Sequence, residues 1–333
     1  MSVAYDRYTM RGQGAAVSVL GIDVSKAAFN CCLNIPDGRF EATFANAPSG
    51  FRKLLRWLEE HHGLDVHVCM EATGPYWRGL ANALNKALMK VSVVNPGRTA
   101  LFARSQLRRT KTDEVDARML ADFCETQKPD LWEPPAPEIL ELRAFLTYRK
   151  QLIRQRVALR QVVSQVVASS SLRKINAVQL QSINDTIDAV EQQIKLVIDK
   201  NRHLHQRVER VKSIVGFGML GAAAIVSQLP VAQLRNAKAV AAYAGLSPSD
   251  RQSGTSLHGK PRICKVGNAE LRRDLYMPAI VAMRFNPILR AFAERLRARG
   301  KPAKVIIVAV MRKLAVLAYT MLTKEAGWAP TET

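Results

Sequence analysis

Five short apolar runs in the first third of the chain constrain the fold more than any other feature. The runs are VSVLGID, AFNCCLNI, RFEATFAN, DVHVCME and KVSVVN. The first three follow one another directly, and the last two alternate with segments whose apolar residues recur at helical spacing. Short runs of this kind, bounded by Gly, Pro, Asn or Asp, are typical of β-strands. Three strands in succession and then alternating helices and strands predict an α/β layer built on a mixed sheet.

A proline-rich break ends this pattern. The segment KPDLWEPPAPE carries four prolines between residues 129 and 137, which predicts a linker. Helical spacing prevails beyond it. The predicted organisation is a leader at 1–16, an α/β domain at 17–130, a linker and coiled-coil region at 131–212, and a mainly α domain at 213–326.

A heptad stripe marks the second region. Between Gln179 and Lys212 the apolar residues recur at alternating steps of three and four, and Asn201 is the polar member of the stripe. An earlier helix, at about 138–168, has a broader apolar face. The two segments predict either an antiparallel helical hairpin or a coiled coil that pairs two protomers. Asn201 on the seam would help to fix the register.

The last third opens with two features that could meet nucleic acid. Gly216-Phe217-Gly218 before a helix of small residues resembles the hairpin of helix-hairpin-helix domains, in which backbone N–H groups meet a phosphate. A tight corner between two helices explains the same residues. A polar loop with basic side chains is then predicted over 246–268.

The charge of the chain is strongly positive and unevenly spread. The net charge is +21, and residues 1–130 carry 17 basic and 14 acidic side chains, whereas residues 131–333 carry 32 and 14. Such an excess indicates a polyanionic partner, which nucleic acid fits better than a membrane surface. Five cysteines without CxxC or Cys/His spacing predict reduced core thiols. The apolar stretch near the end is interrupted by Arg312-Lys313, and the chain is expected to be cytoplasmic, with no membrane span.

Four acidic residues form a candidate metal site. Asp23 and Glu71 each end an apolar strand, and the carboxyl ends of parallel strands share one sheet edge. Asp113 and Asp116 are three residues apart and share a helix face. Taken singly, each acid is better explained as a turn residue, a cap or a match to a helix dipole, and Glu114 keeps that interpretation. Four gathered carboxylates would repel one another unless divalent cations, Mg²⁺ or Mn²⁺, neutralise them.

Several motifs together resemble a known family. GIDVSK, MEATG and KTDEVDARMLADF contain the four acids, and AYAGLSPSDRQSGTS and KVGNAELRRDLYMPA follow in the far half. The set is similar, in order and approximate spacing, to the DEDD insertion-sequence transposases, which are related to the Piv site-specific DNA invertase. The resemblance runs from about residue 17 to 323.

The resemblance implies a fold and a chemistry. It implies an RNase H-type, RuvC-like N-terminal domain, a coiled-coil arm and a C-terminal transposase domain. It assigns Mg²⁺ binding to Asp23, Glu71, Asp113 and Asp116, and the role of DNA-linked nucleophile to Ser253. By the residues alone Ser253 is not distinguished from Thr255 or Ser256. The implied partners are donor and target DNA, a structured guide RNA, and further copies of the chain in a dimer or tetramer. The implied location is the cytoplasm of a bacterium or archaeon, at the nucleoid when the enzyme is active.

Basic residues near these motifs are the candidate nucleic-acid contacts. They are Arg108, Arg109, Lys111, Arg118, Arg251, Lys260, Arg262, Lys265, Arg272 and Arg273. Each is equally a solvated surface charge when taken alone. Three other functions compete with the transposase. An actin-like kinase would need further glycine-rich phosphate loops, which the sequence lacks. A RuvC-like junction nuclease would use a metal-bound water in place of serine, and a non-catalytic RNA-binding scaffold would need neither.

Overall fold

The computed structural model describes residues 18–61, 64–106, 113–165, 169–253, 257–264 and 266–325. The side chains at 113, 114, 163, 165, 249–253 and 257–262 lie outside this description, as does the predicted leader. The chain divides into two compact units, Met1–Pro134 and Pro135–Thr333. The division lies inside the proline-rich segment.

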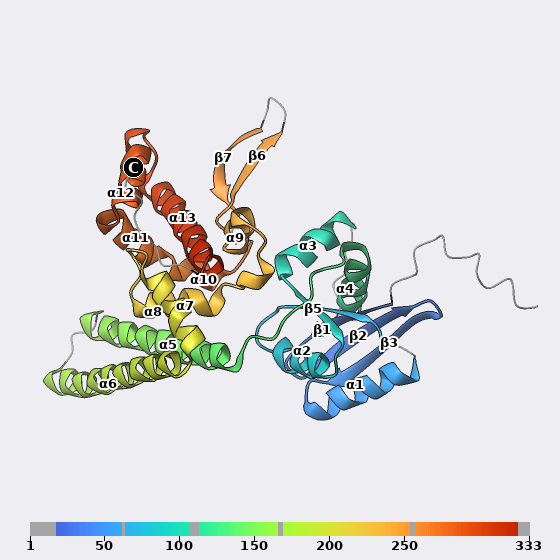
Figure 1. The fold of residues 1–333 in the computed structure, drawn as a ribbon. Coiled ribbons are helices and arrows are strands. Elements are labelled where there is room, and N and C mark those ends of the chain that lie inside the picture. Colours follow the sequence, from blue (N-terminus) through green and yellow to red (C-terminus); the bar gives the residue numbers. More distant parts are fainter. Residues whose placement is uncertain are drawn as a thin grey trace, which may run out of the picture. The chain divides into compact units, whose positions relative to one another are not determined.

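The N-terminal unit is built on one mixed sheet of five strands (Figure 1). Its elements are β1 (Val19–Val24), β2 (Ala28–Ile35), β3 (Gly38–Ala45), α1 (Pro48–Glu60), β4 (His67–Glu71), α2 (Trp77–Lys86), β5 (Lys90–Val94), α3 (Pro96–Ser105) and α4 (Asp113–Gln127). The strand order is β3-β2-β1-β4-β5, in which β1 pairs antiparallel with β2 and parallel with β4. All five predicted strands are confirmed, and Asp113 and Asp116 lie on one helix, α4, as predicted.

Helices cover both faces of this sheet (Figure 1). Leu20 and Ile22 of β1 pack with Leu54 of α1 and Leu80 of α2 on one face. Val19 of β1 lies on the other face, in a cluster with residues of α4. The period of two along a strand sends alternate side chains to opposite faces, so β1 contributes to two cores. The α/β layer on a mixed sheet is therefore confirmed.

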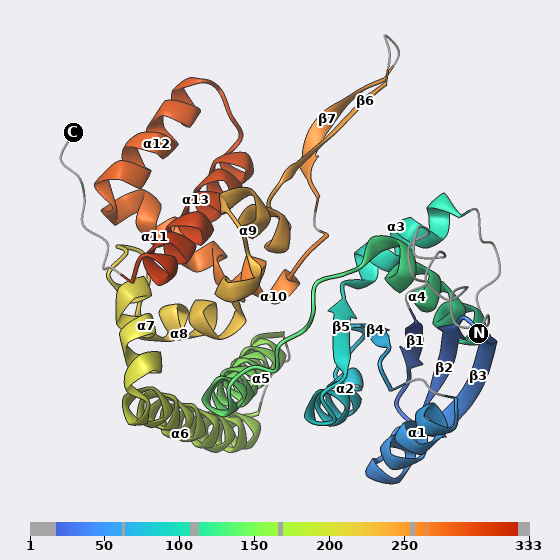
Figure 2. The ribbon, with the colours of Figure 1, turned by 45° about the vertical axis from the view of Figure 1, so that its right-hand side comes forward.

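The C-terminal unit is mostly helical (Figure 2), and its described buried apolar residues form one core cluster. Its elements are α5 (Pro137–Gln165), α6 (Ser170–Lys200), α7 (Arg202–Lys212), α8 (Met219–Gln228), η1 (Val231–Gln233), α9 (Ala237–Tyr243), β6 (Pro248–Ser253), β7 (Leu257–Ile263), α10 (Ala269–Asp274), α11 (Tyr276–Phe285), α12 (Pro287–Ala298) and α13 (Ala303–Thr323). Among the described helices α13 alone is long and apolar enough to cross a membrane. Its buried residues, Val310 and Leu314 among them, belong to the core, so α13 is a core helix.

Helices α5 and α6 lie side by side and run in opposite directions (Figures 1 and 2). Arg149 donates to Glu191 at 2.6 Å, and Arg156 donates to Asn184 at 3.1 Å. Contacts that move back along α6 as they advance along α5 define an antiparallel pair. Of the two arrangements predicted for this region, the hairpin within one chain is the one that the structure shows.

The predicted heptad stripe between Gln179 and Lys212 runs over two helices, because α6 ends at Lys200 and α7 begins at Arg202. Asn201 ends α6 and begins α7, and its side-chain oxygen accepts a hydrogen bond from the backbone N–H of Leu204. Its side-chain nitrogen donates to Glu138 at 2.8 Å. A short polar side chain at a helix start satisfies an N–H group that has no partner within the helix. Asn201 therefore acts as a cap and not as a register residue on a seam.

The predicted polar loop over 246–268 is also wrong in part, because it contains the two-stranded hairpin β6–β7. The segment is rich in Ser, Gly and Pro and has few β-branched residues, so its composition does not indicate strands. Backbone pairing makes the ribbon, with an irregular register between Ser249 and Arg251. Four of the five cysteines are buried as predicted, whereas Cys264 is exposed.

Candidate active site

Two of the predicted acids lie level with each other at one edge of the sheet. In the parallel β1–β4 pair Ile22 is opposite Met70, so the next residues, Asp23 and Glu71, end their strands side by side. Both side chains are half-buried. Met70 and Ile22 belong to the core under α1 and α2. Their neighbours Asp23 and Glu71 therefore face the side of the sheet that α4 covers.

Gly21 brings α4 against β1. A Cβ atom at Gly21 would lie 2.1 Å from the backbone oxygen of Ala117 and 2.3 Å from the backbone nitrogen of Ala121. Only glycine permits so close an approach of a helix backbone to a strand. The Cys124 thiol donates to the backbone oxygen of His67, at the start of β4. Helix α4 thus runs opposite to β1 and β4, and its first turn lies toward their carboxyl ends.

This direction brings the DxxD pair to the same edge as the strand-end acids. Asp116 precedes the residue that covers Gly21, and Asp113 begins the helix. The distance along α4 from Ala117, which covers Gly21, to Asp113 at the helix start is about 6 Å, at a rise of 1.5 Å per residue. From Gly21 to Asp23 is about 7 Å along the strand. The start of α4 and the ends of β1 and β4 therefore share one edge.

Ion pairs also hold α4 over the sheet. Arg118 forms a bidentate pair with Glu41 of β3, and its second nitrogen donates at 2.7 Å. The Arg118 guanidinium lowers the pKa of the Glu41 carboxyl below its ordinary value. Arg39 of β3 donates to Asp122 at 2.9 Å. A bidentate Arg–carboxylate pair fixes orientation as well as distance, so Arg118 has a positional role in this unit.

Glu71 is held by two hydroxyl groups. The Thr73 hydroxyl donates to Glu71 Oε1 at 2.6 Å, and the Thr99 hydroxyl donates to Oε2 at 2.6 Å. Thr99 lies in the first turn of α3 and is 1% exposed. Both carboxylate oxygens of Glu71 therefore have a fixed neighbour.

The donor set at this edge suits a hard divalent cation. Carboxylate oxygens are the ligands that Mg²⁺ and Mn²⁺ prefer. Among the described side chains no three Asp, Glu, His or Cys groups already lie close enough to hold a metal ion. The side chain of Asp113, the fourth acid of the set, lies outside that description. The chemistry of this donor set, with its carboxylates at one sheet edge, fits a divalent cation.

Ser253 lies at the tip of the hairpin in the C-terminal unit. It is the last residue of β6 and is paired through its backbone with Leu257 of β7. The hairpin extends away from the helices of its unit (Figures 1 and 2). The side chain of Ser253 lies outside the described residues, so the predicted role of Ser253 stays a prediction.

The two motifs of the far half meet at the base of this hairpin. The backbone N–H of Asn268 donates to the backbone oxygen of Tyr243 at 2.7 Å. A Cβ atom at Gly267 would lie 2.5 Å from the same oxygen, and φ there is +153°. The Tyr243 hydroxyl donates to the Gln228 backbone oxygen at 3.2 Å. The AYAGL and KVGN motifs therefore join the segment after the hairpin to α9, and Tyr243 joins α9 to α8.

The corner before α8 is tight. A Cβ atom at Gly216 would lie 2.9 Å from both Pro278 O and Ala282 Cβ, so α11 covers this glycine closely. The helix–helix corner therefore accounts for Gly216. A phosphate contact at the start of α8, as in helix-hairpin-helix domains, stays a prediction.

Of the ten predicted nucleic-acid contacts, Arg118 pairs with Glu41, and the other nine fall into three groups. The first group, Arg108, Arg109, Lys111 and Lys265, lies outside the described residues. The second group, Arg251, Lys260 and Arg262, lies on the strands of the hairpin, but its side chains are outside the description. Arg272 donates to the backbone oxygen of Ala244 at 3.0 Å, whereas Arg273 is exposed. These nominations stay predictions.

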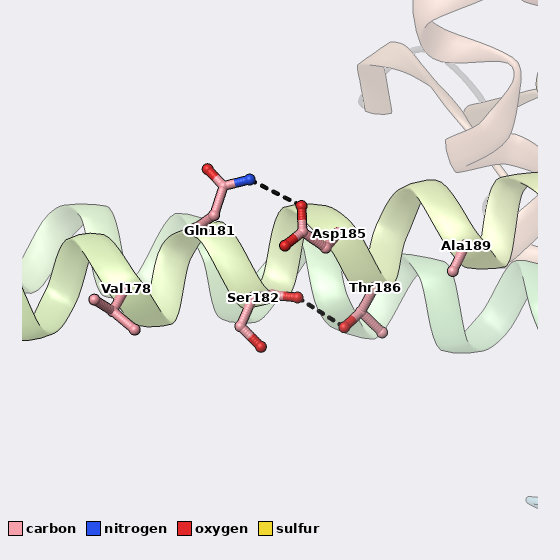
Figure 3. A pocket seen from close by; sticks show the side chains of 6 residues that line it. All are labelled: Val178, Gln181, Ser182, Asp185, Thr186 and Ala189. Atoms are coloured by element: carbon pink, nitrogen blue, oxygen red, sulfur yellow. Dashed lines mark hydrogen bonds between the residues drawn. The ribbon is translucent and has the colours of Figure 1, made fainter.

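A shallow depression on α6 has a different character (Figure 3). Gln181 donates to Asp185 at 2.8 Å, and the Thr186 hydroxyl donates to the backbone oxygen of Ser182 at 2.7 Å. The remaining lining residues are Val178 and Ala189, from the same helix. This lining contains no basic side chain, so the depression gives no support to the predicted nucleic-acid contacts.

We call the sheet edge at which Asp23, Glu71 and the first turn of α4 lie the acid edge. Three further residues of this edge were not predicted from the sequence. Gly21, Thr73 and Thr99 set the approach of α4 and the orientation of Glu71. Gly21 had a signal, since a glycine two residues before an acid on a buried strand marks a close approach of backbone. Thr99 had none, because its contact with Glu71 spans 28 residues.

Comparisons with known proteins show the family of the chain. Residues 20–170 match the family model of the IS110 DEDD transposases. Residues 208–294 match the family model described as Transposase IS116/IS110/IS902 family. A pilin gene-inverting protein of Moraxella bovis is 33% identical over 311 residues, which cover 91% of this chain and 95% of that protein.

Shorter matches point the same way. The IS110 uncharacterized 43.6 kDa protein of Streptomyces coelicolor is 29% identical over 44% of this chain and 35% of its own length. A probable family 20 transposase of Pseudomonas aeruginosa is 26% identical over 46% of this chain and 45% of its own length. With the acid edge and these matches together, the chain belongs to the DEDD insertion-sequence transposase family and is a DNA recombinase.

Proposed function

We propose that this enzyme cuts and rejoins the DNA strands of an insertion sequence through a phosphoserine intermediate at Ser253. A divalent cation, Mg²⁺ or Mn²⁺, would be held by Asp23, Glu71, Asp113 and Asp116. The observation that supports the proposed metal site is the shared edge, where the first turn of α4 lies toward the carboxyl ends of β1 and β4. The proposed role of Ser253 rests on membership of the family. The basic excess of residues 131–333 supports a polyanionic substrate.

The N-terminal unit is proposed to be RuvC-like, with an RNase H-type fold. Support comes from the strand order β3-β2-β1-β4-β5, with an antiparallel meander joined to two parallel strands. In such a sheet the ligand site lies beyond the carboxyl ends of the parallel strands, where the acids are.

The acids would serve as ligands. DEDD transposases generally use a divalent metal ion. When bound, such an ion neutralises phosphate charge and lowers the pKa of an oxygen nucleophile. The chain's own residues would present carboxylates at one edge of the sheet, and two hydroxyl groups would fix the orientation of Glu71.

Ser253 would supply the oxygen that attacks DNA. A bond forms between its Oγ and a backbone phosphorus as the bond from that phosphorus to a deoxyribose oxygen breaks. The serine proton passes to a base, and the released oxygen takes up a proton. Because the phosphodiester is retained as a phosphoserine ester, a deoxyribose hydroxyl of another strand can displace the serine without a further energy source.

The proposed partners are donor and target DNA, a structured guide RNA and further copies of the chain. The outer part of the α5–α6 hairpin supports an oligomer, dimer or tetramer, since Val162, Ile175 and Val178 are 54, 65 and 72% exposed. Apolar side chains exposed together on one arm are typical of a surface that another chain covers. The cytoplasm of a bacterium or archaeon is the proposed location.

Trapping of the covalent intermediate tests the proposal. The full chain is incubated with Mg²⁺, DNA that spans the ends of the element, target DNA, and RNA transcribed from the flanking sequence. A product that resists denaturation and contains both protein and DNA is expected for the wild type and absent for Ser253→Ala and Glu71→Gln. Ser256→Ala, the matched control in the same segment, should keep the product.

An adduct formed by Ser253→Ala would show that another residue is the nucleophile. Strand cleavage by Ser253→Ala without an adduct would favour a nuclease that uses water. Binding of DNA and RNA without cleavage by any form of the chain would favour the scaffold.

A further inference from the structure

We propose that Thr73 and Thr99 are positioning residues, which hold the Glu71 carboxylate in the orientation that binds a divalent cation. This inference rests on the proposed function, because it assigns a role toward the proposed metal site. Neither threonine is among the residues predicted from the sequence to bind metal or nucleic acid.

The two hydroxyl groups approach Glu71 from different elements. Thr73 lies in the segment after β4 and donates to Oε1 at 2.6 Å, whereas Thr99 lies in α3 and donates to Oε2 at 2.6 Å. A hydrogen bond to a charged acceptor is short and about twice as strong as a neutral one. With one donor at each oxygen, rotation of the carboxylate about its last bond would break both bonds.

Burial alone does not account for the contact of Thr99 with Glu71. The Thr99 hydroxyl also lies 2.9 Å from the backbone oxygen of Pro96, an acceptor that would satisfy it without Glu71. Thr126 and Thr320 donate to backbone oxygens in this way, at 2.8 and 2.9 Å. The hydroxyl proton of Thr99 can serve one acceptor at a time, and the ionised carboxylate is the stronger one.

The frame that carries Thr99 is itself fixed. Asn95 caps α3, and its side-chain oxygen accepts from the backbone N–H of Gly97 at 2.7 Å. Pro96 occupies the first turn, where a missing N–H costs nothing. Thr99 is therefore placed by the start of α3 and not by Glu71.

This arrangement suits a metal ligand. Each carboxylate oxygen has two lone pairs, so one hydroxyl bond leaves the other lone pair for a cation. Carboxylates that bind metals are commonly held by outer hydrogen bonds, and loss of such a partner typically costs about 10- to 100-fold in metal affinity or activity. Thr73 and Thr99 would orient Glu71 before the cation arrives.

Binding of Mn²⁺ to the full chain, measured by isothermal titration calorimetry without DNA or RNA, tests the inference. Glu71→Gln should abolish the binding. Thr99→Val keeps the shape but removes the hydroxyl, and should weaken Mn²⁺ binding by about ten-fold or more. Thr73→Val should weaken it by roughly 2- to 10-fold, as expected for one exposed hydrogen bond. Thr99→Ser, which restores the hydroxyl, should recover most of the affinity.

Thr126→Val is the matched control, since it removes a helix hydroxyl that donates to backbone oxygens in the same unit. It should bind Mn²⁺ as the wild type does. If Thr99→Val does not fold, as judged by circular dichroism, Thr73→Val decides, because Thr73 is exposed.

The outcomes separate this inference from the proposed function. Wild-type affinity in Thr99→Val and Thr73→Val, with binding lost in Glu71→Gln, would overturn the positioning role and leave the metal site standing. Failure of the wild type itself to bind Mn²⁺, or undiminished binding by Glu71→Gln, would overturn the proposed metal site and the positioning role with it.

Discussion

Gly21 shows how one residue sets the geometry of the acid edge. The contacts that a Cβ atom would make there, with Ala117 and Ala121, are to backbone atoms and not to flexible side-chain ends. Helix α4 would have to move as a whole to admit a methyl group. Since α4 carries Asp113 and Asp116, that movement would also draw two of the four acids away from Asp23.

Gly21→Ala is therefore expected to destabilise the N-terminal unit by about 2 kcal/mol or more, in the range of overpacked cores. Urea unfolding followed by tryptophan fluorescence measures this, since three of the four tryptophans, Trp57, Trp77 and Trp132, lie in the N-terminal unit. Recombination should fall as well, because the acid edge is displaced.

The control for Gly21→Ala is Gly79→Ala. A Cβ atom at Gly79 would lie 3.5 Å from the ring of Phe51, an ordinary contact, and Gly79 is inside α2. This substitution should stabilise by about 0.5–1 kcal/mol, the difference between glycine and alanine inside a helix. Equal stability of the two variants would contradict the close approach of α4 to β1.

At the scale of elements, the junction of α6 and α7 decides how the helical region is built. The heptad residues on each side of Asn201, such as Val197 and Leu204, are buried in the same core. The stripe therefore serves two helices that pack within one chain. A polar residue at the junction caps the second helix and bonds to Glu138 of α5.

Substitution of Asn201 distinguishes a cap from a seam position. Asn201→Leu should lower the stability by about 1 kcal/mol, as should Asn201→Ala, because each removes the cap. Asn201→Ser should keep most of it. Thermal unfolding followed by circular dichroism at 222 nm is the measurement. A higher melting temperature for Asn201→Leu would instead favour one continuous helix with an apolar seam.

At the scale of the whole molecule, the feature to explain is the net positive charge of residues 131–333. The +18 on residues 131–333 is spread over helices and over the hairpin, and single members such as Arg149 and Arg272 have partners within the chain. The field comes from the sum and not from any one cation. Phosphate binding by such a surface releases counterions, so its affinity depends on salt.

Affinity for duplex DNA should therefore fall steeply with salt. If six cations of the full chain contact phosphates, the slope of log K against log[KCl] is about −5. Fluorescence anisotropy between 50 and 300 mM KCl measures it. Arg273→Gln should make the slope shallower by about 0.9. Arg290→Gln, which removes a cation 3.9 Å from Glu294, is the matched control and should leave the slope unchanged. A flat wild-type response would show that the basic surface does not bind DNA.

Local signals in the sequence determined much of this protein. The five strands and α4 follow from apolar periodicity and turn residues, which act over a few residues and so can be recognised along the chain. The carboxyl-edge positions of Asp23 and Glu71 follow from the same strands. The proline-rich segment predicted where the two units divide, because proline interrupts helices and sheets alike.

Tertiary structure decided what depends on distant partners. The bond between Thr99 and Glu71 and the contact of Gly21 with Ala117 join residues far apart in the sequence. The cap at Asn201 and the β6–β7 ribbon overrode local patterns, because capping and backbone pairing depend on which N–H and C=O groups lack partners in the fold. The sequence by itself determined which acids lie at strand ends and helix starts. Only packing brought α4 to their edge and fixed the orientation of Glu71, because those contacts are long-range and leave no periodic trace in the chain.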